Sequence, residues 1–354
     1  MPVSKAIHEQ LVYLTGSKCY SYLCSALQKI LIIQTAFTGD VVLATPLLEK
    51  LHDTYPEAAI DFLLRKGNEG LLTGHPFLRH TLIFDKKSGK LRNLFALSRR
   101  IRKERYDLVI NLHRFGSSGF LVWRSGAKEK VGFDKNPFSF CYHRKIRHEI
   151  GTGKHEIRRN MELIAHLAGP ETLRPKLYPG ADDEKKVSFH KSHGPYVCMA
   201  PTSVWFTKQW PAEKWVELIR MIPAKYRVYL IGAPADVEAC DKIIKTAGRK
   251  DSFNLCGQLT LLQSAALMKD AAMNYVNDSA PAHMASAVNA PVTEIFCSTI
   301  PAYGFGAVSE HTRIIETKEK LACRPCGLHG HKECPENHFK CALGIPADDV
   351  MGNI

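Results

Sequence analysis

Apolar residues in the first half of the chain come in short runs that alternate with longer amphipathic stretches. Runs such as KILIIQ, AIDFLL and DLVINLH have the length and aliphatic content of buried strands, whereas VVLATPLLEKLHDTYP and the basic LRNLFALSRRIRKERY have helical spacing. Repeated strand and helix patterns are typical of an α/β domain with a mostly parallel sheet. We therefore predict such a domain from Lys29 to a helix that ends at Gly169.

The same alternation restarts after residue 193. The strand-like runs PYVCMAP, YRVYLIG, NLCG, MNYVN and PVTEIFC are separated by helical patterns and predict a second, doubly wound α/β domain. Residues 170–193 are rich in proline and charge and are predicted to be a linker. The predicted organisation is an N-terminal extension at 1–28, a first domain at 29–180 and a second domain at 181–354. Loops after the strands of the two domains would line a cleft between them.

Length and charge narrow the class of protein. A chain of 354 residues suits two domains of roughly 150 residues each. Its net charge is +13, and residues 86–160 hold 20 Lys or Arg against 6 Asp or Glu. Such a segment attracts an anionic partner, whether nucleic acid, lipid headgroups or a phosphorylated glycan. No run resembles a secretory signal or reaches the ~18 to 20 apolar residues of a membrane span, so a cytoplasmic location is predicted.

Three candidate functional residues lie where predicted strands give way to helices. Asp40 follows Gly39 in TAFTGD, where it either caps a helix predicted to begin at Val41 or acts as a general base at the cleft. Lys208, in PTSVWFTKQWP, is either a phosphate-binding cation or a solvated surface lysine. Ser279 opens a predicted helix in NDSAPAH and either caps it or helps its N–H groups to bind an anion. Position alone leaves both roles open for each residue.

The order and spacing of ILIIQTAFTGDVVLATP, APTSVWFTKQWP, GAPAD, NLCGQLTLLQSAALMKDA and NDSAPAHMASAVNAP resemble those of the heptosyltransferases of lipopolysaccharide core assembly, glycosyltransferase family 9. The resemblance runs from about Lys29 to about Val350. Its most specific parts are the Gly-Asp turn at 39–40 and the Asp-Ser-x-x-x-His signature at 278–283. It implies two facing Rossmann-like domains of GT-B type and inverting, metal-independent transfer of a heptose from ADP-heptose to a lipopolysaccharide or lipooligosaccharide core acceptor.

The resemblance also implies roles for individual residues. The first domain would bind the acceptor and the second the nucleotide sugar, with Asp40 as catalytic base and Lys208 as the cation that stabilises the leaving diphosphate. Asp236 falls where an acidic residue meets the ribose, and Leu259 falls near the adenine. The implied donor contacts are Thr202, Ser203, Lys208, Asp236, Leu259, Asp278, Ser279 and His283, and the predicted acceptor contacts are Thr38, Gly39, Arg114 and Arg144.

The basic segment acquires an explanation from this resemblance, because such an acceptor carries phosphates and acidic sugars at the inner face of the inner membrane. Peripheral contact with an anionic membrane surface is therefore predicted, and a merely solvated basic surface is the alternative. The basic residues lack the interleaved aromatics of single-strand platforms, and no nucleic-acid-binding module is recognisable, so no nucleic acid partner is expected.

The tail carries four cysteines in a C-x2-C-x7-C-x6-C spacing, Cys323, Cys326, Cys334 and Cys341. Four thiolates can close a tetrahedral shell, so a structural zinc ion is one interpretation, with free thiols or disulfides as the others. The remaining seven cysteines, Cys19 and Cys24 among them, are scattered as reduced thiols usually are. No cofactor is expected to be required for catalysis.

Alternatives of other kinds remain open at this point. The same fold could use a different nucleotide sugar, because nothing in the sequence separates heptose from hexose-like donors. A catalytically silent relative that only binds glycolipid is a second alternative. A nucleic-acid-binding protein, suggested by the charge and the cysteine tail, is the third.

Overall fold

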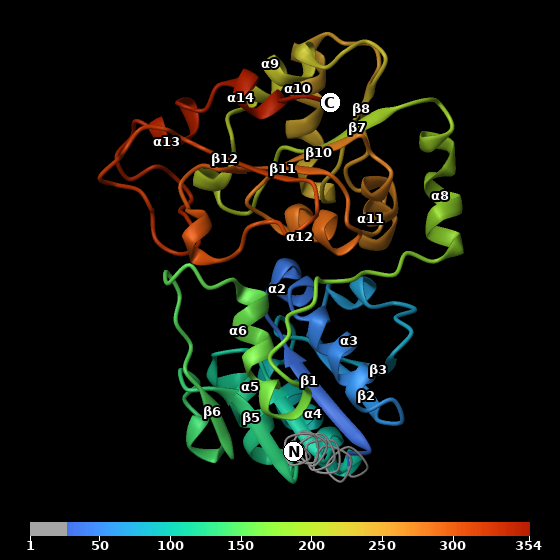
Figure 1. Ribbon diagram of the computed structural model, residues 1–354, viewed down its shortest axis with the longest axis vertical. Helices are drawn as coiled ribbons and strands as arrows, with labels where there is room; N and C mark the ends of the chain where they lie inside the picture. The colour runs from blue at the N-terminus through green and yellow to red at the C-terminus, as the bar shows by residue number, and fades with distance from the viewer. Residues whose placement is uncertain (1–26) are drawn as a thin grey trace, which may run out of the picture.

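The computed structural model describes residues 27–354 as two α/β halves stacked along the long axis of the molecule (Figure 1). The predicted α/β class with two parallel sheets is confirmed. Most of the predicted N-terminal extension, with Cys19 and Cys24, lies outside the described residues. Among residues 27–354, none of the helices has both the length and the apolar character needed to cross a membrane.

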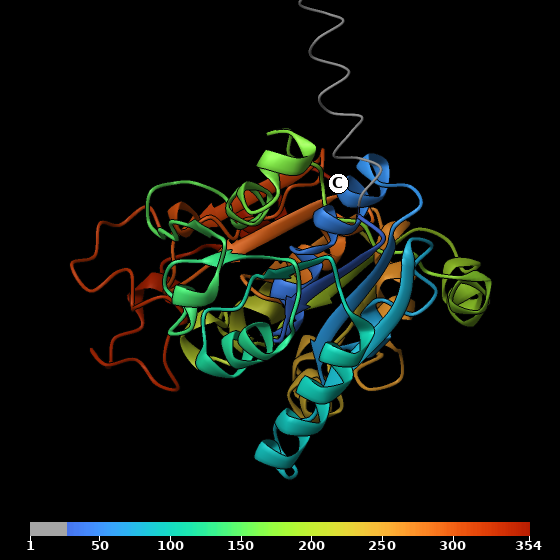
Figure 2. The same ribbon diagram turned by 90° about the horizontal axis from the view of Figure 1, so that it is seen from below.

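The first half is built on a six-stranded parallel sheet in the order β3-β2-β1-β4-β5-β6. Its strands are β1 (Lys29–Gln34), β2 (Ala59–Arg65), β3 (Leu78–Phe84), β4 (Leu108–Asn111), β5 (Glu129–Phe133) and β6 (Arg144–Ile146). Its helices are α2 (Thr38–Val42), α3 (Thr45–Thr54), α4 (Lys90–Glu104), α5 (Gly116–Arg124), α6 (Glu156–Glu162) and α7 (Ala165–Ala168). In Figure 2, α4 runs along the outside of this half.

The second half repeats the design with the order β12-β11-β10-β7-β8-β9. Its strands are β7 (Tyr196–Ala200), β8 (Arg227–Leu230), β9 (Ser252–Asn254), β10 (Met273–Asn277), β11 (Val292–Phe296) and β12 (Thr312–Glu316). Its helices are α8 (Ala181–Lys191), α9 (Ala212–Met221), α10 (Val237–Ala247), α11 (Leu261–Lys269), α12 (Ala280–Ala287), α13 (Lys340–Leu343) and α14 (Ala347–Met351).

Both sheets reverse their strand order at the first strand, between β1 and β4 and between β7 and β10. In open parallel sheets, ligands bind in the crevice at the carboxyl ends of the strands where this reversal occurs. The loop after β1 leads into α2, and the loop after β10 leads into α12. These two helices pack against each other, so the two switch points meet where the halves touch.

Several predicted elements need correction. The predicted linker at 170–193 is extended only in its first part, because residues 181–191 form α8. That helix escaped a periodicity search because Val187 is its one buried residue, although acidic residues in its first turn and basic residues in its last suit the helix dipole. The strand predicted at NLCG lies slightly earlier, at β9. The domain boundaries themselves stay a prediction.

The contact between the halves contains a buried apolar core. One continuous buried cluster includes Val41 and Val42 of α2, the aliphatic residues of α3, and Ala282 and Met284 of α12. The other large clusters lie on the far sides of the two sheets, one in each half. The carboxyl ends of both sheets are therefore held together by burial of apolar area rather than only by surface polar contacts.

Candidate active site

Asp40 lies in the first turn of α2, immediately after β1. The helix begins at Thr38 rather than at the predicted Val41, so Asp40 is inside the helix. Its Oδ2 accepts a hydrogen bond of 3.1 Å from the Phe37 N–H. The capping role is therefore present, and it fixes the carboxylate at the positive end of the helix.

The environment of Asp40 makes it a stronger base than an ordinary aspartate. Burial, followed by the negative charge of Glu156, raises the pKa of Asp40 from 3.8 to about 6, against the opposing effects of backbone N–H groups and of Arg114. The side chain nonetheless remains partly exposed to solvent. A carboxyl group with such a pKa is mostly ionised at pH 7 and accepts a proton more readily than an unperturbed one.

Gly39 brings this turn into direct contact with the second half. A Cβ at this position would lie 2.6 Å from Cδ2 of His283, closer than real Cβ contacts, so glycine alone permits the approach. His283 is buried in α12, and burial lowers its pKa to about 4. Its Nδ1 has no hydrogen-bond partner among the described residues. A neutral imidazole with a spare ring nitrogen thus lies beside the α2 turn.

Lys208 and Asp278 form an ion pair on the second half. Lys208 Nζ lies 2.6 Å from Asp278 Oδ2, and the side chains are only 15% and 6% exposed. The hydroxyl of Thr299 donates to the same carboxylate oxygen. Lys208 is therefore not the solvated lysine of the alternative interpretation. Asp278 fixes its ammonium group close to His283, whose pKa the charges of both residues affect.

The other implied phosphate-loop residues lie at the carboxyl ends of the same strands. Ser279 is the residue before α12, and its hydroxyl donates to the carbonyl of Asn277 at 3.2 Å. Thr202 and Ser203 follow β7 and are partly exposed. Asn277 joins the two loops, because its amide contacts the Pro201 carbonyl at 2.8 Å and the Trp210 N–H at 3.0 Å. The structure thus brings these residues together with Lys208.

Asp236 and Leu259 lie on neighbouring loops, after β8 and β9. The Gly257 N–H donates to the Gly232 carbonyl at 3.0 Å and holds these loops together. Asp236 Oδ2 accepts the Ala233 N–H at 2.7 Å, so its carboxylate caps a short 3-10 turn. Leu259 is partly buried against the core shared by the two halves.

Cations gather at the carboxyl edge of the first sheet. Arg65 ends β2, Lys86 follows β3 and Arg114 follows β4. Burial, then the charges of Arg65 and Lys90, lowers the pKa of Lys86 to about 8. The guanidinium of Arg65 lies over the exposed ring of Phe37, 4.9 Å from its centroid. Neither Lys86 nor Arg65 was among the predicted acceptor residues.

The predicted acceptor residues are divided by the structure. The hydroxyl of Thr38 in α2 donates at 3.0 Å to Asn68 in the loop after β2, and Arg114 affects the pKa of Asp40 directly. Arg144 instead begins the edge strand β6, and its charge acts on Glu129 at the start of β5. It is therefore not brought together with Arg114 and Asp40.

The cysteine-bearing tail reaches the cleft. Thr207 exchanges hydrogen bonds with the backbone of His331, at 2.7 Å and 3.1 Å. Gly330 packs so closely on the neighbouring Lys208 that a Cβ would lie 3.1 Å from its Cγ. The adjacent His329 stays solvent-accessible, and burial, Lys208 and Arg114 lower its pKa. An imidazole between the two halves was missed because the tail has no periodicity to place it.

The four tail thiols lie within electrostatic reach of one another, since burial and the other three cysteines raise the pKa of Cys341 to about 11. Cys323 Sγ is 3.8 Å from His338 Nε2. Among residues 27–354, however, no group of three or more His, Cys, Asp or Glu side chains is arranged to hold a metal ion. The donor set suits zinc, but the side-chain arrangement does not form a coordination shell.

A buried carboxyl group behind the ion pair was also missed. Glu294 lies in the middle of β11, and its Oε2 accepts the Ala307 N–H at 2.7 Å while Oε1 has no partner among the described residues. Burial and the charge of Asp278 raise the pKa of Glu294 well above its usual range, which favours its neutral form. A glutamate inside an aliphatic parallel strand is the sequence signal that points to it.

The start of α6 is clasped by the loop after β11. The carbonyl of Gly304 accepts the Glu156 N–H at 2.7 Å, and that of Tyr303 accepts the Arg159 guanidinium at 2.9 Å. His155 Nε2 is 2.8 Å from the carbonyl of Gly306. Arg159 is buried and pairs with Glu156 at 2.6 Å. The second half thus holds in place the carboxylate that raises the pKa of Asp40.

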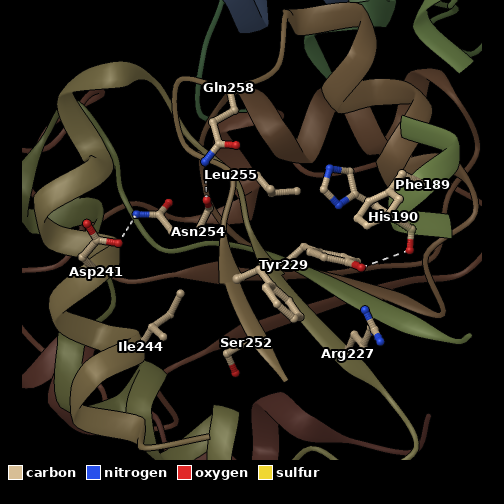
Figure 3. Close-up of a pocket in the computed structure, with 11 residues that line it drawn as sticks. Phe189, His190, Arg227, Tyr229, Asp241, Ile244, Ser252, Asn254, Leu255 and Gln258 are labelled. Atoms are coloured by element: carbon tan, nitrogen blue, oxygen red, sulfur yellow. Dashed lines mark hydrogen bonds between the residues drawn. The ribbon is translucent and has the colours of Figure 1, made fainter. Parts of the chain in front are cut away.

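A separate hollow of about 530 Å³ lies beside the edge strand β9, between α8 and α10 (Figure 3). Phe189, Tyr229 and Asn254 are among its lining residues, and none of the predicted site residues lines it. This hollow is therefore distinct from the region around Asp40 and Lys208.

Comparison with known proteins places this geometry in a family. The sequence model of Glycosyltransferase family 9 (heptosyltransferase) matches residues 94–338. Lipopolysaccharide heptosyltransferase 3 of Escherichia coli is 29% identical over 277 residues, which cover 74% of this chain and 82% of that protein. Lipopolysaccharide heptosyltransferase 1 of Pseudomonas aeruginosa is 24% identical over 318 residues, covering 84% and 86%.

Among solved structures, the ADP-heptose lipopolysaccharide heptosyltransferase II of Escherichia coli superposes with a TM-score of 0.75 at 20% identity, covering 92% of this chain and 96% of that one. This likeness confirms the predicted GT-B type of fold. The family match spans more than half of the sequence. The chain therefore belongs to glycosyltransferase family 9, the heptosyltransferases.

Proposed function

We propose that this protein transfers a heptose from ADP-heptose to the core oligosaccharide of a lipopolysaccharide or lipooligosaccharide, with inversion and without a catalytic metal ion. The observation that carries the proposal is the position of Asp40, a carboxyl group with a pKa of about 6 at the contact between the two switch points. The names of the relatives support the donor and the acceptor class.

In the proposed reaction, Asp40 removes the proton of the attacking acceptor hydroxyl as its oxygen bonds to the anomeric carbon. The bond from that carbon to the diphosphate breaks, and ADP leaves with the electron pair. Attack from the side opposite the leaving group inverts the anomeric configuration. Because Asp40 lies on the first half and Lys208 on the second, base and leaving group would lie on opposite sides of the sugar.

Fixed charges and dipoles replace a metal ion in this scheme. Lys208 and the N–H groups at the start of α12 stabilise the negative charge that develops on the diphosphate. Asp278 orients Lys208 through their 2.6 Å ion pair. Thr202, Ser203, Ser279 and His283 complete the proposed phosphate and sugar contacts.

The nucleoside end of the donor is assigned to the loops after β8 and β9. In this assignment Asp236 faces the ribose and the backbone around Leu259 borders the adenine. The capping bond of Asp236 Oδ2 to Ala233 supports this role, because it orients the carboxylate before the donor binds.

The acceptor is assigned to the first half. Arg65, Lys86 and Arg114 line the carboxyl edge of the sheet and suit phosphates and acidic sugars. Thr38 and Gly39 lie beside the base, and Arg144 would contact an outlying anionic group. We place the protein at the cytoplasmic side of the inner membrane, in peripheral contact with it, because the acceptor is anchored there.

The test is release of ADP from ADP-heptose in the presence of a core-sugar acceptor. Asp40→Asn should lower turnover by about 10²- to 10⁴-fold, the usual contribution of a positioned base. Turnover near that of the wild type in a folded Asp40→Asn protein would refute the assignment of the base. A panel of nucleotide sugars would show whether the protein uses another donor. If no nucleotide were released from any of them, the alternative of a catalytically silent protein that only binds glycolipid would be supported.

We also propose that the four tail thiols bind one structural zinc ion after their side chains rearrange, since in this structure they do not form a coordination shell. Four cysteines in this spacing are the donor set that zinc prefers, and their mutual effect on the pKa of Cys341 supports their proximity. No catalytic step depends on this ion.

A further inference from the structure

The outer side of the first half carries a group of exposed aromatic side chains, here called the aromatic patch. Phe115 and Phe140 are 65% and 67% exposed, and Phe95 and Trp123 are each 47% exposed. They come from α4, α5, the loop before α5 and the short 3-10 helix at Ser139–Cys141. The fifth member, Phe138, is partly buried.

Four members of the aromatic patch, Phe95, Trp123, Phe138 and Phe140, form one series of ring contacts that includes Phe120. The rings of Trp123 and Phe138 are 6.0 Å apart, and those of Phe138 and Phe140 are 5.8 Å apart. Phe120 lies beneath them, 5.4 Å from Phe95 and 6.0 Å from Trp123, and packs on the core of the sheet. A rigid aromatic surface anchored to the core is thus presented to solvent.

Isolated exposed apolar residues are ordinary, whereas a contiguous aromatic surface marks a site of interaction. Gly119 of α5 allows close packing beneath this surface. A Cβ at Gly119 would lie 2.8 Å from Cβ of Phe138, so the close packing of α5 on the Phe138 segment depends on a glycine there. The exposure is therefore fixed by packing and does not reflect a loose segment.

Basic residues border the aromatic patch. Leu91, Phe95 and Arg99 are spaced four residues apart on one face of α4, and Arg124 follows Trp123 at the end of α5. The positive charges of Lys130 and Lys145 oppose the effect of burial on the pKa of Cys141, the residue that follows Phe140. Within residues 27–354, no ion pair neutralises Arg99, Arg124, Lys130 or Lys145.

The aromatic patch also connects to the proposed acceptor side of the cleft. Phe115 directly follows Arg114, and its ring is 4.8 Å from that of His113 at the end of β4. A Cβ at Gly116, the residue after Phe115, would lie 3.9 Å from the ring of Phe138, so the backbone next to Phe115 borders the rest of the aromatic patch. A molecule held by its polar end near Arg114 could rest its apolar end along this surface.

We propose that the aromatic patch and its basic border form the membrane-docking face of this protein, with the aromatic rings inserted at the headgroup level of an anionic lipid bilayer. Aromatic residues favour the boundary between headgroups and acyl chains, and nearby Lys or Arg side chains add electrostatic attraction to anionic lipid. Charge complementarity selects an anionic membrane over another protein as the occupant. The inference rests on the proposed function for its biological context and specifies which surface meets the membrane.

Docking in this orientation has a consequence for the substrate. The cleft edge at Arg114 would lie close to the bilayer surface, so the sugar of a lipid-anchored acceptor would reach Asp40 while its acyl chains stayed in the membrane. The second half, which carries the proposed donor site, would remain in water.

The test is cosedimentation of the full chain with vesicles of phosphatidylglycerol and phosphatidylethanolamine, compared with vesicles of phosphatidylcholine. The double variant Trp123→Ala, Phe140→Ser should bind the anionic vesicles more weakly than the wild type by roughly tenfold or more, because it removes two rings that would be partly buried in lipid. Phe189→Ser is the matched control, since Phe189 is also 66% exposed but lies on α8 of the second half.

Wild-type binding to anionic vesicles that the double variant loses and Phe189→Ser retains would support the proposal. Equal binding by wild type and double variant, or no wild-type preference for anionic vesicles, would overturn it. A dimer in solution that the double variant abolishes would also overturn it and would assign the aromatic patch to a second copy of the chain.

Vesicle binding needs neither donor nor acceptor, so its outcome is independent of the proposed reaction. With a short, water-soluble acceptor, the double variant should keep the wild-type rate of ADP release. With an acceptor embedded in vesicles, it should lose activity about as much as it loses binding. Loss of activity on the soluble acceptor as well would overturn the proposal, because it would show that these residues act on the fold or the cleft.

Discussion

Replacing Asp40 by asparagine should stabilise the protein at neutral pH while it removes activity. The folded structure raises the pKa of Asp40 from 3.8 to about 6, so folding makes ionisation of this side chain less favourable. A shift of this size corresponds to ~3 kcal/mol at about 1.4 kcal/mol per pKa unit. Because the side chain is partly exposed to solvent, we expect a gain in unfolding free energy of roughly 1–3 kcal/mol for Asp40→Asn at pH 7.5.

The sign and the pH window follow from proton linkage. Below pH 3.8 the carboxyl is protonated in both states, and its ionisation contributes nothing. As pH rises towards 6, the unfolded chain releases the proton while the folded chain retains it, so the wild type loses stability. Above that pH range the carboxyl is ionised in both states, and the loss of wild-type stability stays constant. The asparagine variant does not titrate, so its advantage should grow between these two pH values.

The assay is urea unfolding of both proteins at a series of pH values from 4 to 8. Asparagine keeps an amide oxygen that can accept the Phe37 N–H, so the cap should survive. Asp183→Asn is the control, because Asp183 also accepts a backbone N–H at a helix start, that of Gly180 at 2.9 Å on α8. The Asp183→Asn protein should lose a few tenths of a kcal/mol of unfolding free energy. A neutral or destabilising Asp40→Asn at pH 7.5, or a gain that is the same at pH 4, would refute the reasoning.

Three further predictions concern the cleft and the tail. Gly39→Ala should abolish ADP release, because a Cβ would lie 2.6 Å from the imidazole across the cleft, whereas Gly116→Ala, with 3.9 Å of clearance, should keep activity in the same assay. Lys208→Met should weaken ADP binding, measured by calorimetry, by roughly 10- to 100-fold through loss of a charge-assisted contact, and Lys214→Met on the surface of α9 should not. Elemental analysis should find one zinc ion per chain, lost in Cys326→Ser, and a metal-free wild type would end the zinc proposal.

Much of the architecture could be predicted from the sequence because the strands are buried on both faces and read as continuous aliphatic runs, as in KILIIQ of β1. Elements without that signal were missed. The strand β12, TRIIE, is an edge strand with no fully buried residue, and α8 buries only Val187. Local periodicity cannot reveal an element whose stability comes from a few tertiary contacts.

The candidate site was predictable to the extent that its residues follow strands. Gly39 and Asp40 were found because a glycine and a charge interrupt an apolar pattern. Their proximity to His283 could not be deduced, since it depends on how the halves pack. His329 was missed for the same reason, and Glu156 was missed because its influence on Asp40 depends on the clasp formed by the loop after β11.

The clasp at the start of α6 has a mechanical consequence. The helix packs on α3 of the first half, yet three backbone carbonyls of the second half hold its first turn. The segment from α6 to α7 therefore lies between the two halves, and the chain on each side of this segment connects it to a half. Bending at residues 147–153, where Gly151 and Gly153 adopt positive φ, would let the segment from α6 to α7 move together with the second half. If the protein binds and releases a nucleotide as proposed, these contacts would limit how far the two halves separate.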